Sequence, residues 1–117
     1  MSLTREQIDE FDGYMQKWQS AFGLHGWRIE RVPKVTKGAL ASVLIDYEGH
    51  TAFYRIGEWK TTEPSPFNLE QTAVHELLHV LLSDLKQAVK KESDSETVMG
   101  LEHGVVNLLE KLLMRTA

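Results

Sequence analysis

The 117-residue chain contains no cysteine, and this absence limits the chemistry that is open to it. Disulfide bonds and thiolate metal ligands are excluded, so a metal site in this protein has to be built from histidine and carboxylate side chains. The lack of cysteine also favours, weakly, a protein that works in a reducing compartment.

Long hydrophobic runs and an excess of positive charge are missing as well. No uncharged apolar run approaches the roughly 20 residues that a membrane-spanning helix requires, and the first residues, MSLTREQIDEF, contain no apolar core of a signal peptide. The net charge is −4 and the pI is about 5.7, which leaves no electrostatic footprint for nucleic acid. We therefore expect a cytoplasmic protein that binds neither a membrane nor nucleic acid.

The composition that is present is that of an ordinary globular protein. Hydrophobic residues make up 42% of the chain and charged residues 26%, which argues against a disordered or fibrous chain. A domain of about this size buries roughly two-thirds of the surface that its unfolded chain exposes, which is enough for a real core. We expect a single domain over residues 1–117.

The first half of the chain predicts one helix followed by strands. A capping box at Thr4 precedes apolar residues that recur every three or four positions up to Phe22, which predicts a helix. Residues 27–32 alternate and predict a short strand. Residues 39–59 are rich in β-branched and aromatic side chains around the turn YEGHT, which predicts a hairpin.

The second half predicts two helices. The loop TTEPSPFN is followed by Asn68, the expected N-cap of a helix that continues to about Val89. A final helix is expected from about Ser95 to Met114. The chain therefore predicts an α+β fold, with an N-terminal helix, a small three-stranded twisted sheet that is mixed or antiparallel, a central helix and a C-terminal helix.

The segment TAVHELLHVLL places two histidines and a glutamate inside an apolar run. On a helix, His75 and His79 lie one turn apart on the same face, so their imidazoles can converge on one cation. Glu76 lies about 100° around the helix, close to such a cation. Zinc-assisted hydrolysis needs these groups, because imidazoles hold the metal, the metal lowers the pKa of a bound water and a carboxylate takes its proton. That carboxylate can then protonate a leaving amine.

A catalytic zinc ion normally has three protein ligands, so a third is expected elsewhere. The apolar stripe of the last helix consists of Val98, Val105, Leu109 and Leu112. Glu102 interrupts this stripe, and because a metal compensates the cost of burying a carboxylate, Glu102 is the predicted third ligand. His103, one position further around the helix, is the alternative ligand or a residue that supports the site. His103 shares a row of the helix with Glu110, and because of that charge we expect this row to lie nearer to solvent.

HELLH, followed on the next helix by Glu102, resembles the gluzincin branch of the zincin metallopeptidases. More narrowly, the short chain and the segments TAVHELLHVLL and EHGVVNLL resemble small metallopeptidases of phages and prophages, the minimal gluzincins. The resemblance implies a minimal zincin-like fold that hydrolyses peptide bonds of a peptide or protein substrate. It also implies one zinc ion per chain, bound by His75, His79 and Glu102, with Glu76 as general base and acid.

Two further properties of the family bear on this chain. In larger gluzincins, an aspartate four residues after the third ligand orients a metal-bound histidine. This chain has Val106 at that position. In the family, the edge strand before the active-site helix pairs with extended substrate, and here that strand is expected to be the second one of the hairpin, TAFYRIGEW. Tyr54 in this strand is a candidate oxyanion donor, although tyrosine in a strand is more often simply packed.

Two alternatives to a peptidase stay open. A zinc-stabilised module of phage or prophage origin would bind a peptide or protein along the strand edge without useful turnover, which the departure at Val106 favours. The other alternative is a metal-free helical interaction protein, in which the HELLH pattern would have arisen by chance. The identity of the metal is open too, because two histidines and one carboxylate also suit iron.

Overall fold

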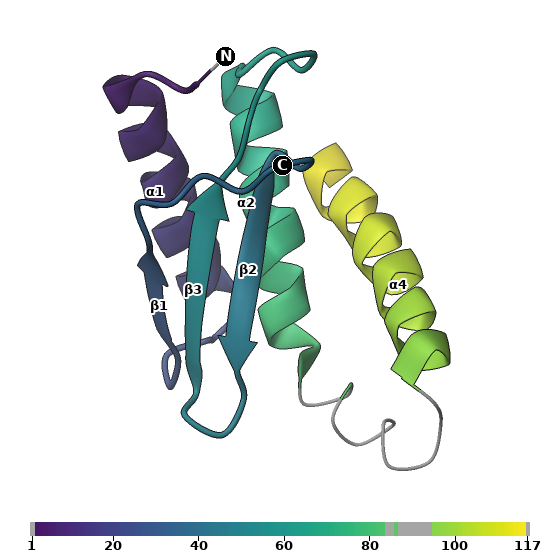
Figure 1. The fold of residues 1–117 in the computed structure, drawn as a ribbon. Helices are drawn as coiled ribbons and strands as arrows, with labels where there is room; N and C mark the ends of the chain where they lie inside the picture. Colours follow the sequence, from purple (N-terminus) through teal and green to yellow (C-terminus); the bar gives the residue numbers. More distant parts are fainter. Residues whose placement is uncertain (1, 84–85, 87–94, 117) are drawn as a thin grey trace.

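The computed structural model of the chain describes residues 2–83, Lys86 and residues 95–116 (Figure 1). Along this part of the chain the elements are α1 (Arg5–Ala21), β1 (Arg28–Arg31), β2 (Ala41–Asp46), β3 (Thr51–Ile56), α2 (Pro66–Leu81) and α4 (Ser95–Thr116). The predicted α+β fold is confirmed. No helix among the described residues has both the length and the apolar character needed to cross a membrane.

Helix α1 begins where the capping box predicts. The hydroxyl of Thr4 accepts a hydrogen bond from the backbone N–H of Gln7, and the Gln7 side chain accepts one from the backbone N–H of Thr4. These two bonds satisfy backbone donors that a helix start otherwise leaves unpaired. The apolar stripe then buries Phe11 and Met15 in the core, where α1 packs against α2.

The sheet is mixed, with the strand order β1-β3-β2. Strand β3 pairs in parallel with β1 and in antiparallel with β2, so both of its edges are hydrogen-bonded. The expectation that the second strand of the hairpin is the free edge is therefore wrong. A hairpin has two outer edges, and β1 occupies the one along β3, so within the described residues the free edge of the hairpin is that of β2.

Helix α2 lies at the centre of the packing. Figure 1 shows α1 and α2 on the same face of the sheet, with α4 beside α2 on the side of β2. One side of α2 contributes Leu69 and Leu77 to a core shared with α1 and the sheet. Another side contributes Val74 and Leu78 to a smaller core shared with α4. Because two cores share one helix, α2 is apolar on most of its surface.

The start of α2 differs from the prediction. Its N-cap is Ser65, whose hydroxyl accepts a hydrogen bond from the backbone N–H of Asn68 at 3.1 Å. Pro66 occupies the first turn, where its missing N–H costs nothing and its fixed φ suits a helix. The helix thus starts before Asn68, and it ends at Leu81. The predicted extension to Val89 falls largely outside the described residues.

The buried face of α4 also differs from the predicted stripe. Val106 is fully buried and Met114 nearly so, whereas Val105 is 41% and Leu112 47% exposed. Among the described elements, α4 packs mainly against α2, so it buries only a narrow strip of its surface. The row that contains Glu110, expected nearer to solvent, is the row that faces α2. The side chain of Val98 lies outside the described residues.

Replacing Leu77 by alanine should lower the free energy of unfolding by about 2–5 kcal/mol, because Leu77 is fully buried between the sheet and α1. Leu44→Ala is the matched control, since this leucine on β2 is 67% exposed and its truncation should cost under about 0.5 kcal/mol. Urea unfolding of both variants measures the difference. Equal losses in the two variants would contradict the described core.

Candidate metal centre

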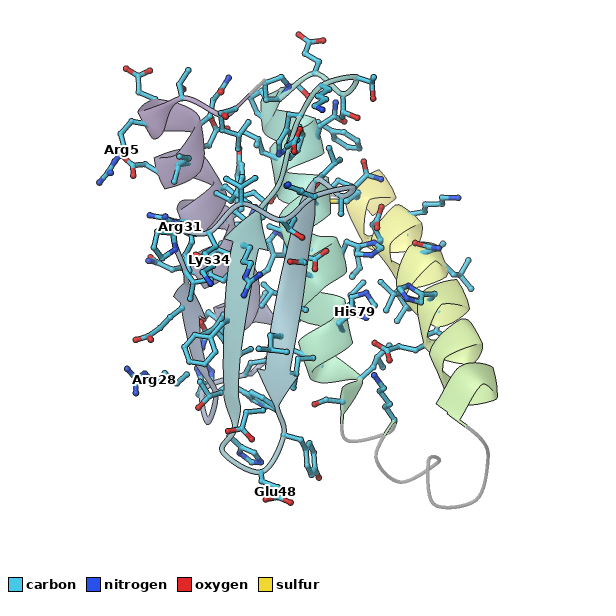
Figure 2. All side chains as sticks on the ribbon, viewed as in Figure 1. Arg5, Arg28, Arg31, Lys34, Glu48 and His79 are labelled. Atoms are coloured by element: carbon cyan, nitrogen blue, oxygen red, sulfur yellow. The ribbon has the colours of Figure 1, made fainter. Side chains whose placement is uncertain are left out.

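Three histidines meet between α2 and α4. The α-helical geometry of α2 stacks His75 and His79 one turn apart, with ring centroids separated by 5.1 Å. His103 of α4 approaches His79 edge-on, also at 5.1 Å between ring centroids. Figure 2 shows the side chain of His79 pointing from α2 toward α4. Both helices therefore contribute imidazoles to the same small region.

The spacing of these histidines suits a single metal ion. One nitrogen from each of His75, His79 and His103 lies within 4.8 Å of the other two. Ligand atoms about 2.1 Å from a tetrahedral zinc ion lie roughly 3.4 Å from one another. The separations of the three nitrogens, at most 4.8 Å, are thus close to the spacing that zinc requires.

Two carboxylates of α4 contact the histidines of α2. Glu102 pairs with Nδ1 of His79, and Glu110 pairs with Nδ1 of His75. The ammonium group of Lys86 lies 3.2 Å from the second oxygen of Glu102. Burial opposes the ionisation of Glu102, but its hydrogen bonds with His79 and Lys86 outweigh this effect and lower its pKa. Glu102 is therefore held as a carboxylate.

Burial also controls the charge of His79. Desolvation lowers the pKa of His79 below its ordinary value, even though the hydrogen bond to Glu102 acts in the opposite direction. The neutral imidazole, which is the form that binds metal ions, is thereby favoured at neutral pH.

Glu76 is the most buried carboxylate of this region, with only 6% of its surface exposed. Desolvation raises its pKa to about 7, with a further upward contribution from Glu110 and a downward one from His75. A carboxyl group with a pKa near 7 can both accept and donate a proton at neutral pH, as a general base and acid must.

A groove runs along the site. A cavity of about 520 Å³ lies between β2 and the two helices, and its lining includes His75, Glu76, His79 and His103. A second cavity of about 290 Å³ shares four of the same lining residues, which are Ala39, Ala41, His75 and Glu76. The edge strand β2 forms one wall, since residues 41–45 line the larger cavity. The backbone of a free strand edge thus lies next to the histidines.

The structure brings together most of the residues predicted from the sequence and separates one. His75, Glu76, His79, Glu102 and His103 all line the larger cavity. Tyr54 does not line either cavity. Its hydroxyl donates a hydrogen bond to Asp12 at 2.6 Å, and its ring packs 5.9 Å from that of Phe11. Tyr54 therefore serves the core between β3 and α1.

The sequence prediction missed Glu110 and Lys86 as members of this site. Glu110 follows His103 by two helical turns, so the two side chains share a face of α4. This spacing is a signal that could have identified Glu110 once His103 was considered. Lys86 follows the described end of α2 and has no comparable pattern around it.

Comparisons with models of protein families, with curated proteins and with solved structures found no match to this chain. The likeness to gluzincins thus depends on the residues of the chain alone, and it stays a prediction.

The raised pKa of Glu76 predicts how pH affects stability in the metal-free protein. Between the ordinary value of 4.5 and about 7, the folded state holds a proton on Glu76 that the unfolded state has lost. Stability must therefore fall as the pH rises through this range, by at most roughly 3 kcal/mol relative to Glu76→Gln, which does not titrate. Urea unfolding of both proteins with a chelator, from pH 5 to pH 8, measures this difference. Parallel curves would contradict it.

Proposed function

We propose that this protein is a zinc-dependent peptidase that hydrolyses peptide bonds, with Glu76 as general base and acid. The observation that carries the proposal is the position of Glu76, which is buried and has a pKa of about 7 beside a three-histidine cluster. A buried carboxyl with a shifted pKa in a cleft is typical of a functional group. Its place in a groove next to a free strand edge favours an extended substrate.

The side chains present fit a zinc ion. His75 and His79 of α2 supply two imidazoles, and α4 brings both Glu102 and His103 to the same place for a third ligand. Nitrogen and oxygen donors of this kind are the usual ligands of catalytic zinc sites. When bound, the ion supplies a Lewis acid and lowers the pKa of water.

Glu76 performs the proton transfers. As a carboxylate it accepts a proton from the attacking water, and as a carboxylic acid it donates that proton to the nitrogen of the leaving amine. In the metal-free protein burial raises the pKa of Glu76 to about 7, and a bound cation would lower it again, so Glu76 would meet the attacking water as a carboxylate. Burial of Glu76 also restricts its contact with bulk water.

Strand β2 is the part of the protein that would hold the substrate. Its free edge can add an extended peptide as a further strand, so that main-chain hydrogen bonds provide affinity. Residues 41–45 of this strand line the larger cavity together with His75 and Glu76. A peptide paired with β2 would therefore pass directly in front of these side chains.

Replacing Glu76 by glutamine should abolish cleavage while zinc is retained, because the amide cannot accept the proton. We expect a loss of at least about 100-fold in rate. New termini on denatured casein or a peptide library, read by mass spectrometry, measure cleavage, and plasma mass spectrometry measures zinc per chain.

The matched control is Glu63→Gln, which makes the same change on an exposed loop residue and should leave cleavage intact. A chelator should stop cleavage by the unmodified protein. If this protein and Glu76→Gln both capture peptides specifically but neither produces new termini, the peptidase proposal is wrong. The zinc-stabilised binding module would then be the better explanation.

A further inference from the structure

Each histidine of HELLH contacts a carboxylate of α4 through the same ring atom, Nδ1. His75 contacts Glu110 in this way, and His79 contacts Glu102. A carboxylate at Nδ1 stabilises the tautomer that carries its proton there, which leaves the lone pair on Nε2. Both rings can thus offer Nε2 to a metal ion. Carboxylates generally orient metal-binding histidines in this way.

The two oxygens of Glu102 are already engaged. One contacts Nδ1 of His79, and the other lies 3.2 Å from the ammonium group of Lys86. The Glu102 side chain is only 9% exposed, so water has little access to these contacts. Moving Glu102 onto a metal would weaken its pairing with both groups, which is costly for partly buried donors.

His103 is the group of α4 that is available as the third ligand. One of its nitrogens lies within 4.8 Å of the ligand atoms of both His75 and His79. Its ring contacts His79 edge-on and lines the larger cavity. Three histidines with an open fourth position are an established type of catalytic zinc site.

We propose that His75, His79 and His103 bind the metal, and that Glu102 and Glu110 position the rings of His79 and His75 without binding it. The inference deepens the metal site on which the proposed function rests. Val106 is apolar and fully buried, and Glu110, one turn further along α4, is the carboxylate on this face that contacts His75.

The test measures metal binding in the absence of any peptide. Metal-free protein is titrated with Co²⁺, whose visible absorption reports the number and type of ligands, and zinc affinity is obtained by competition. His103→Ala should change the Co²⁺ spectrum and weaken binding by at least about 100-fold. His103→Asn is a second variant, and because His103 is exposed, neither replacement should disturb folding.

The positioning residues should give a different result. Glu110→Ala and Glu102→Ala should weaken binding by about 10- to 100-fold while the Co²⁺ spectrum keeps its shape, because the ligand atoms are unchanged. Glu110→Gln should restore part of the loss, since its amide oxygen still accepts a hydrogen bond from Nδ1 of His75. Glu63→Gln is the matched control and should bind like the unmodified protein.

A changed spectrum in Glu102→Ala, with no change in His103→Ala, would overturn the inference and make Glu102 the third ligand. Binding of neither Co²⁺ nor zinc by the unmodified protein would overturn it as well. Failure of the proposed peptidase function can be distinguished from failure of this inference. A protein that binds Co²⁺ through three histidines but cleaves no peptide supports this inference and contradicts the peptidase. An active peptidase in which Glu102 is the third ligand supports the proposed function and contradicts this inference.

Discussion

Helix α2 is buried or partly buried along most of its length, and it carries the buried Glu76 and the partly buried His75 and His79. Burying a polar group without a partner costs free energy, and burying a charged one costs more. Carboxylates of α4 supply partners for both histidines, whereas Glu76 stays under-solvated and its pKa rises to about 7. Both the contacts of α4 with the histidines and the raised pKa of Glu76 follow from this one requirement.

Helix α4 is held to α2 by a narrow contact. Its apolar part consists of the buried Val106 and Met114, which cluster with residues of α2, and of the partly buried Leu109 and Leu113. Its polar part consists of the carboxylate pairs with the histidines. Since α4 contacts mainly α2 within the described structure, the apolar contact alone leaves much of its surface exposed. The candidate site and the docking of α4 therefore depend on the same side chains, and a metal ion would stabilise both.

The sheet separates a structural side from a side that is open to a ligand. Strand β3 is paired on both edges, and Tyr54 on this strand is fixed by Asp12 and Phe11 of α1. Strand β2 keeps one edge free, and that edge forms a wall of the groove that contains the histidines. The parallel pairing of β1 with β3 thus leaves β2 as the strand of the hairpin whose outer edge borders the histidines.

The sequence by itself determined the features that depend on neighbours along the chain. The capping box at Thr4, the hairpin and the one-turn spacing of HELLH follow from local geometry, because helical and strand periodicities are properties of the backbone. Only the tertiary structure decided the strand order, the face that α4 buries and the pairing of Glu110 with His75. These depend on contacts between distant segments, and several apolar faces of α4 satisfy the same periodicity until α2 selects one of them.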